Sequence, residues 1–207
     1  MGGVREGGPG GGAQIAARVG GPMQGVLSAG EGMPPTAILA EGVSQLVAID
    51  LWTGQPRWRF STRRGGAIHL ARSGRLLIVA SEGAIHALDI TTGEDIWRYS
   101  ARTRFASAPV VVGDVVVAIG KDGNCYGVDL ITGSARWSRT VKAAAGTSPV
   151  GVRRVAVVVT REDAILGTDV NSSAGSWRLP APGPSAGACL ATPALSGLNA
   201  PRRVGTA

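Results

Sequence analysis

Hydrophobic positions in the middle of this chain come in short runs separated by polar turns, and the arrangement recurs. Three stretches share it: GRLLIVASEGAIHALD (74–89), DVVVAIGKDGNCYGVD (114–129) and RVAVVVTREDAILGTD (154–169). Each contains a run rich in β-branched residues, a tight turn with acidic residues or glycine, and a second short apolar run. This pattern predicts an antiparallel hairpin in each stretch.

Further strands are expected on either side of these hairpins. SAPVVV (107–112) and SPVGV (148–152) are short apolar runs with a proline near their start, a strand position at which a missing N–H donor is tolerated. One unit therefore carries four strands, which in the second complete copy fall at 107–112, 115–120, 124–130 and 135–140.

A second phrase repeats with the same period. AIDLWTGQPRW (48–58), ALDITTGEDIW (87–97), GVDLITGSARW (127–137) and GTDVNSSAGSW (167–177) align with one another. Their aspartates are 39, 40 and 40 residues apart, and so are their tryptophans. Four short strands repeated at this spacing are typical of the blades of a β-propeller. We therefore predict an all-β propeller segment of about four four-stranded blades, with an incomplete ring.

The residues of this phrase are expected to have structural roles. The aspartate can accept backbone N–H groups of the turn, and the glycine supplies the positive φ that lets the chain reverse. The tryptophan is a large rigid plane that can pack one blade on the next. In the fourth copy Ser173 replaces the glycine, so we expect its turn to be the least regular. The residues with predicted turn and docking roles are Asp50, Gly54, Trp58, Asp89, Gly93, Trp97, Asp129, Gly133, Trp137, Asp169 and Trp177.

The chain divides into three predicted parts. Residues 1–35 are rich in glycine and are expected to be flexible, and 187–207 begin a further blade and continue as a loosely ordered tail. Between them, 36–186 hold the repeats, and the first blade lacks an obvious opening strand. The blades are expected at 36–60, 61–100, 101–140 and 141–180. Three alternatives stay open: a piece of a longer propeller, two arcs that associate into one ring, and a closed four-bladed ring.

The repeated phrase resembles that of the quinoprotein-type, or PQQ-like (pyrroloquinoline quinone-like), β-propeller family, most fully in ALDITTGEDIW. The resemblance covers about 36–195. In that family the tryptophan docks against the turn and the neighbouring blade. The resemblance implies this role for Trp58, Trp97 and Trp137, whereas Trp177 follows a turn that departs from the family pattern.

The family contains quinone-dependent dehydrogenases and also non-enzymatic scaffolds, such as an outer-membrane assembly lipoprotein and propellers fused to bacterial kinases. Its alcohol-oxidising members carry adjacent cysteines beside the quinone, whereas Cys125 and Cys189 of this chain are far apart. We therefore predict a non-catalytic protein-interaction scaffold without catalytic, cofactor-binding or metal-binding residues. Two alternatives stay open: a remnant or subunit of a quinone-dependent dehydrogenase, which would use PQQ with calcium, and the sensor propeller of a bacterial serine/threonine kinase.

Charge adds one candidate surface. The net charge is +7, but the basic residues are spread along the chain and no nucleic-acid-binding motif accompanies them, so nucleic acid is not an expected partner. A basic residue just after each tryptophan would form a curved row along one edge of the propeller. This row is either a solvated surface or a docking site for an acidic partner. Its members are Arg59, Arg98, Arg139 and Arg178.

Other features carry less information. His69 and His86 lie in neighbouring predicted strands and are interpreted as structural polar residues rather than a metal pair. The two cysteines are interpreted as buried or idle thiols. No window approaches the roughly 20 apolar residues of a membrane span, and the start lacks the apolar core of an export signal. We therefore expect a cytoplasmic protein with a protein partner, and a homodimer that completes the ring as a further arrangement.

Overall fold

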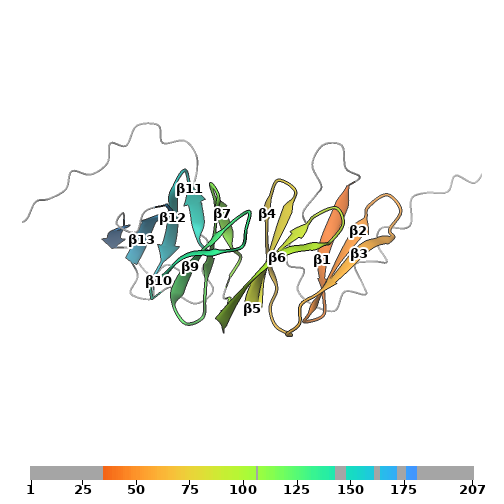
Figure 1. Ribbon diagram of the computed structural model, residues 1–207, viewed down its shortest axis with the longest axis horizontal. Helices are drawn as coiled ribbons and strands as arrows, with labels where there is room; N and C mark the ends of the chain where they lie inside the picture. The colour runs from red at the N-terminus through yellow and green to blue at the C-terminus, as the bar shows by residue number, and fades with distance from the viewer. Residues whose placement is uncertain (1–34, 106, 143–147, 161–163, 172–175, 181–207) are drawn as a thin grey trace, which may run out of the picture.

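The regular structure of this protein consists of β-strands. The computed structural model describes residues 35–105, 107–142, 148–160, 164–171 and 176–180. These residues form fourteen strands in four antiparallel sheets, which follow one another in chain order (Figure 1). The predictions for 1–34, for the turn at Ser173 and for 187–207 lie outside the described residues. Within them, no helix is long and apolar enough to cross a bilayer.

Two of the sheets contain three strands and two contain four. The first sheet has β1 (Thr36–Glu41), β2 (Gln45–Asp50) and β3 (Pro56–Ser61), and the second has β4 (His69–Ser73), β5 (Leu76–Asp89) and β6 (Asp95–Arg104). The third has β7 (Val110–Val112), β8 (Val115–Ile119), β9 (Asn124–Asp129) and β10 (Ala135–Thr140). The fourth has β11 (Val150–Val152), β12 (Val155–Val159), β13 (Ala164–Asp169) and β14 (Ser176–Pro180).

The strand predictions agree with the third sheet except at its start. The opening strand β7 begins at Val110, directly after Pro109, and not at residue 107. β11 likewise begins at Val150, directly after Pro149. Each proline precedes its strand because a residue without an N–H cannot donate to the ladder. Among the described residues the first sheet begins with β1; the prediction that it lacks an opening strand concerns residues before 35, which lie outside them.

The second sheet differs from the predicted hairpin in one respect. The stretch 76–89 is a single element, β5, instead of two strands. Its first part pairs with β4 and its second part pairs with β6. The predicted turn coincides with Gly83, which has a φ of +83°, a backbone conformation that favours glycine.

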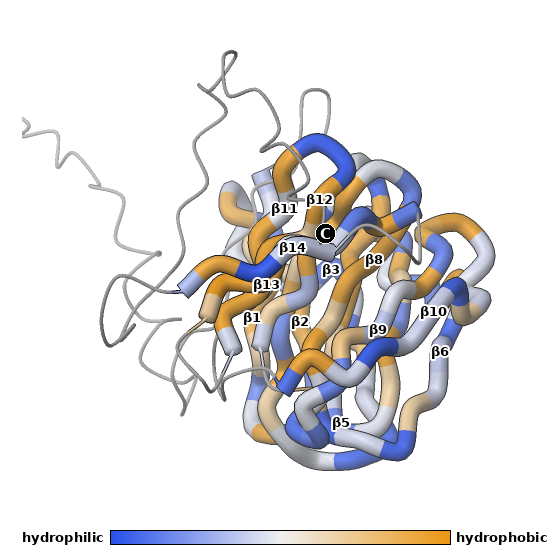
Figure 2. Tube along the Cα trace, turned by 90° about the vertical axis from the view of Figure 1, so that its left-hand side faces the viewer, coloured by the Kyte–Doolittle hydropathy of each residue, from blue (hydrophilic) through white to orange (hydrophobic). Residues whose placement is uncertain are grey.

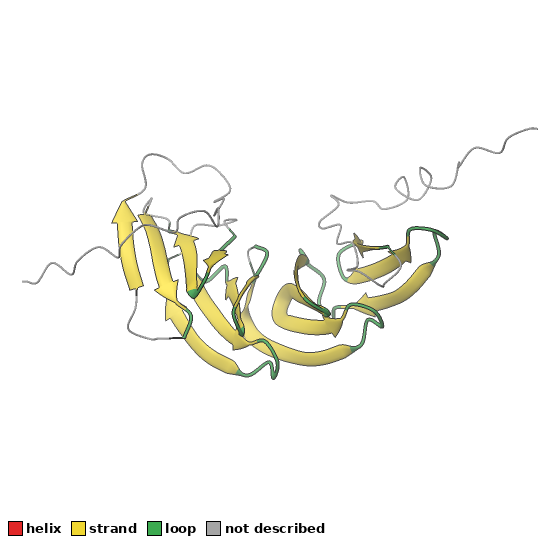
Figure 3. Ribbon diagram, turned by 90° about the horizontal axis from the view of Figure 1, so that it is seen from above, coloured by secondary structure: helices red, strands yellow, loops and turns green. Residues whose placement is uncertain are grey.

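The four sheets lie along an open arc, and the first and fourth sheets do not meet (Figure 3). This arrangement confirms the predicted all-β propeller segment with an incomplete ring in the described part of the chain.

Each inner sheet is hydrophobic on both faces because it packs between two neighbours. Consecutive residues of β5 show this: Leu77 and Val79 pack with the first sheet, whereas Ile78 packs with the third. The third and fourth sheets meet in the same way, through residues such as Val117 and Val158. Full burial of such a side chain contributes about 1.5–3 kcal/mol. Burial on both faces explains why the strands read as continuous apolar runs instead of alternating ones.

Candidate functional site

The repeated aspartates bind the backbone of the turns between the last two strands of each sheet. Asp50 Oδ1 accepts hydrogen bonds from the N–H groups of Trp52 at 2.8 Å and Thr53 at 3.1 Å. The same two bonds recur two and three residues after Asp89 and Asp129. Asp169 accepts the bond from the residue two positions later. These carboxylates therefore fix the shape of the turns.

The second carboxylate oxygen of each aspartate meets an arginine. In the first and third sheets the arginine directly precedes the tryptophan, and in the second and fourth it stands just before the sheet's second strand. The pairs are Asp50 with Arg57, Asp89 with Arg75, Asp129 with Arg136, and Asp169 with Arg154. Sequence reasoning missed these arginines because they lie at two different positions of the repeat.

Hydrogen bonds hold the turn carboxylates in the charged form. The backbone N–H of Thr132, followed by the Arg136 guanidinium, keeps the pKa of Asp129 well below its usual value of 3.8. Arg57, followed by the N–H of Thr53, lowers the pKa of Asp50. Asp50 and Asp129 are therefore ionised at neutral pH and engaged by neighbouring donors.

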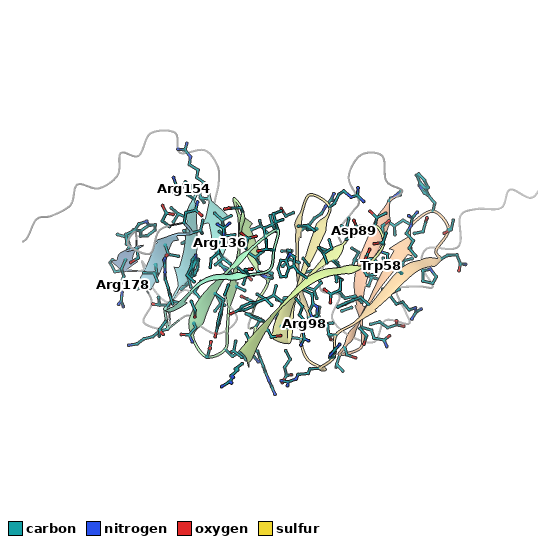
Figure 4. The ribbon with its side chains drawn as sticks, viewed as in Figure 1. Trp58, Asp89, Arg98, Arg136, Arg154 and Arg178 are labelled. Carbon is teal, nitrogen blue, oxygen red and sulfur yellow. The ribbon has the colours of Figure 1, made fainter. Side chains whose placement is uncertain are left out.

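The tryptophans join each sheet to the next one. Trp58 Nε1 donates to the carbonyl oxygen of Ile90 at 3.0 Å, Trp97 to that of Leu130 at 2.9 Å, and Trp137 to that of Val170 at 2.7 Å. Each acceptor is the residue directly after the turn aspartate of the following sheet. In Figure 4, Trp58 and Asp89 lie next to each other at the border of the first two sheets. We call this contact, in which an indole binds the turn of the following sheet, the tryptophan joint.

The glycine of the turn lies against the indole ring. A Cβ atom on Gly93 would come within 2.5 Å of the Trp58 ring, and one on Gly133 within 2.6 Å of the Trp97 ring. Both glycines also have left-handed backbone, with φ of 75° and 71°. In these two joints glycine therefore meets both the backbone conformation and the close approach of the ring, whereas the turn that receives Trp137 has Ser173 at this position.

The predicted arginine row does not keep one orientation. Arg59 forms an ion pair with Glu41 at 2.8 Å. Arg139 is two residues after its tryptophan, so it turns to the same face as Trp137, lies over its ring at 4.6 Å and donates to Thr168 Oγ1. Arg98 lies opposite His86 in the register of β5 and β6, and Figure 4 shows it far from Arg178. A shared docking role for these four residues stays a prediction.

The histidines have separate surroundings. His86 Nδ1 lies 2.9 Å from Asp95 Oδ2, and its ring packs edge-on against Phe60 of the first sheet at 5.1 Å. Burial lowers the pKa of His86, although Asp95 opposes this shift. His69 is paired with Ala80 in the same sheet. Among the described residues, no group of three or more His, Cys, Asp or Glu side chains is placed to hold a metal ion.

Cys125 is a free, buried thiol in the core between the third and fourth sheets. Burial raises its pKa to about 12, although Arg139 opposes this shift. Such a thiol remains protonated at neutral pH and is therefore a poor nucleophile.

Open hollows on the described surface include two that are lined by arginine. One, of about 500 Å³, lies at the joint between the third and fourth sheets and includes Arg136, Trp137 and Asn171. The other, of about 360 Å³, lies beside β6 and includes Arg64 and Arg102. Glu82 lies in the second hollow and forms an ion pair with Arg104 at 2.8 Å. Both hollows are lined by arginine and suit polar or acidic groups of a partner.

Replacement of a joint glycine tests the close approach of the ring. Gly113→Ala is the matched control, because Gly113 also has a positive φ, of 62°, but nothing lies within 4 Å of an added Cβ. We expect Gly113→Ala to lower the free energy of unfolding by about 1–2 kcal/mol through backbone strain. Gly133→Ala should cost about 1–3 kcal/mol more, since the Trp97 ring must move. Urea denaturation measures both, and equal losses would contradict the role of the ring.

Substitutions of Trp97 distinguish the contribution of its ring to stability from that of its N–H group. Trp97→Phe keeps an aromatic ring but leaves the Leu130 carbonyl oxygen without its donor, which should cost about 1–3 kcal/mol of unfolding free energy. Trp97→Ala should cost about 3–5 kcal/mol. Trp52→Ala is the control, because Trp52 is exposed, and a change within about 0.5 kcal/mol is expected. If Trp97→Phe behaves like Trp52→Ala, the hydrogen bond does not stabilise the joint.

Acid should weaken the turns. The pKa of Asp129 is lowered in the folded protein, so its contribution to stability is complete above the usual value of 3.8 and is lost as the pH falls below it. Asp129→Asn keeps a side-chain oxygen that can accept the backbone hydrogen bonds, but its amide carries no charge. We expect this variant to be less stable than the wild type at pH 7 and the difference to shrink below about pH 4. Urea denaturation across pH checks this, and a difference independent of pH would exclude the charge effect.

Comparison with known proteins identifies the repeat. The family model described as outer membrane protein assembly factor BamB matches residues 11–181. No protein among the curated proteins searched matches this chain.

Three solved structures share the fold. BamB from Moraxella catarrhalis is 24% identical, with a TM-score of 0.58, over 71% of this chain and 49% of that chain. The computationally designed Ika8 protein is 20% identical, with a TM-score of 0.58, over 69% and 46% of the two chains. The designed Ika4 protein is 13% identical, with a TM-score of 0.60, over 73% and 94%. This chain thus spans about half the length of the BamB chain that it matches. By its repeat, its fold and the match to the family model, the chain belongs to the PQQ-like β-propeller family of the outer membrane protein assembly factor BamB.

Proposed function

We propose that this protein is a non-catalytic scaffold that binds a protein partner along the edge formed by its aspartate turns. The residues that recur in every sheet serve the turns and the tryptophan joints. Specific recognition therefore depends on the positions that vary from one turn to the next.

Exposed apolar side chains on this edge carry the proposal. Trp52 is 77% exposed and Ile131 is 68% exposed. Both occupy the second position after the turn aspartate, in the first and third sheets, so both lie on the same edge of the propeller. Exposed apolar side chains that gather on one edge and are rimmed by polar residues mark interaction surfaces. The neighbouring Arg57 and Arg136 supply a polar surrounding, and aromatic residues and arginine are enriched in protein interfaces.

The family supports a protein as the partner. BamB is described as an assembly factor for outer membrane proteins. A partner of this chain on the turn edge would offer an apolar surface to Trp52 and Ile131 and polar groups to the arginine–aspartate pairs beside them. A non-catalytic role is supported by the turn aspartates, because their two oxygens are engaged by backbone donors and by arginine.

Site-specific cross-linking tests this edge. A photoreactive amino acid would be placed at Trp52, at Ile131, and at Val43 as a matched control. Val43 is also 68% exposed but lies between β1 and β2, at the opposite edge of the first sheet. In cells that naturally make the protein, we expect positions 52 and 131 to cross-link to the same protein and position 43 not to do so. Cross-linking from position 43 alone would contradict the assigned edge.

The catalytic alternative needs a separate assay. Purified protein would be mixed with PQQ and calcium and assayed for dye-coupled alcohol oxidation. We expect no turnover above that of free PQQ. Turnover that depends on the protein would overturn the non-catalytic part of the proposal, whatever the cross-linking shows.

A further inference from the structure

The three tryptophan joints define what a completed joint looks like. In each one the residue after the turn aspartate is covered: Ile90 is 2% exposed, Leu130 is 9% exposed and Val170 is 1% exposed. The tryptophans of the first two joints are 9% and 8% exposed. A completed joint therefore covers the residue that accepts the hydrogen bond, and it buries the indole fully in the first two joints and partly in that of Trp137.

The first sheet has the receiving half of a joint without this cover. Leu51 occupies the accepting position and is 54% exposed. Its turn is already formed: Asp50 binds the next two turn residues, and the Leu51 N–H donates to Pro35 O at 2.9 Å. The equivalent N–H of Ile90 donates to Arg75 O at the same distance. The receiving turn is therefore organised before anything binds to it.

The fourth sheet has the donating half. Trp177 on β14 is 42% exposed, and Leu179, two residues later on the same strand, is 53% exposed. The Trp177 ring lies against its own sheet, because a Cβ on Gly167 would come within 2.1 Å of it. Trp137 has the same relation to Gly127, at 2.2 Å, and its indole donates across a completed joint. Figure 2 looks onto this end of the arc, where β12 and β13 are strongly hydrophobic.

We propose that two copies of this chain bind head to tail, with Trp177 of one copy on the turn at Leu51 of the other. The two halves of the joint lie at opposite ends of one arc, so each copy offers one donor and one acceptor (Figure 3). Two such contacts close a ring of two arcs. The match covers 49% of the BamB chain, a propeller of the same fold, so a ring of that size has room for a second arc.

The contact between the two copies involves only a small part of the first sheet. On the outer face of the first sheet, Leu39, Val47 and Ile49 form a small cluster that is already buried. The surface offered to the second copy is therefore the turn and not the centre of the sheet. Most of the binding energy then comes from one indole on one turn, which is typical of an interface with a single hot spot. We expect association that depends on protein concentration.

Complementation between two variants tests the proposal. Leu51→Glu removes the acceptor surface and keeps the donor, and Trp177→Glu does the reverse. Each variant alone should be monomeric, near the 21.0 kDa of one chain, at concentrations where the wild type has twice that mass. An equimolar mixture should regain a two-chain species, because one intact joint remains. Trp52→Glu is the control: Trp52 is adjacent to Leu51 but stays outside the joint, so this variant should remain a dimer.

Sedimentation velocity over a concentration series measures the mass of the wild type, of the three variants and of the mixture. We expect the dissociation constant to rise at least about 30-fold in each single joint variant. The proposal is overturned if the wild type stays monomeric throughout, if the single variants remain dimeric, or if the mixture does not associate. Higher oligomers that grow with concentration would overturn the closed pair.

A second measurement does not depend on the folding of the variants. A photoreactive amino acid in place of the exposed Leu179, which leaves Trp177 intact, should cross-link to the turn at 50–54 of another copy. Mixing isotopically labelled and unlabelled protein distinguishes a contact between copies from one within a copy. A cross-link only within one chain would show that another part of the same chain covers Trp177, and would overturn the proposal. Neither outcome affects the cross-links from Trp52 and Ile131 to a protein partner.

Discussion

The hydrogen bond from an indole N–H to the turn of the following sheet is the interaction on which this fold depends. Trp97 reaches the Leu130 carbonyl oxygen only because the turn holds that oxygen in place, and the turn keeps its shape because Asp129 binds its backbone. Gly133 completes the set, since any side chain there would occupy the space of the ring. In the first two joints aspartate, glycine and tryptophan therefore act together, whereas the joint of Trp137 forms on a turn that has Ser173 in place of the glycine. This coupling gives the repeat its constant period.

Charge has a structural use in these turns. A carboxylate that only accepted backbone bonds would leave its second oxygen to water, but in each sheet an arginine binds it. Arg57 and Arg136 directly precede the tryptophan of their sheet. Arg75 and Arg154 instead lie just before the second strand of their sheet. The fold requires a positive charge near the aspartate and tolerates more than one source for it. Part of the arginine content of this basic chain thus stabilises turns and is not a free surface for acidic partners.

Much of the fold followed from the sequence, because the features that determine it are local and repeated. Strand runs, turn glycines and the spacing of the tryptophans predicted the four blades. The arginine partners could not be predicted in this way, because Arg75 and Asp89 are 14 residues apart and meet only through the pairing of strands. Arg139 shows a different limit. It follows Trp137 by two residues instead of one, so its side chain lies on the same face of the strand as the tryptophan, opposite to the face of the other three arginines. The exposed Leu51 and Trp177 could be recognised as unusual only once their counterparts were seen to be buried.

A repeat that joins each unit to the next in one direction always leaves one donor and one acceptor unused at the ends of an open arc. In the described part of this protein these groups are Trp177 and the turn at Leu51, and both keep the arrangement of the completed joints. The stability of a repeat protein is close to a sum of units and joints, so closing the ring adds joints without any change within the blades. Ring closure is therefore favoured by the same contact that holds the arc together. The turn edge remains available, because Ile131 is exposed beside a joint that is already complete. Assembly of the ring and binding of a partner on that edge can therefore occur together.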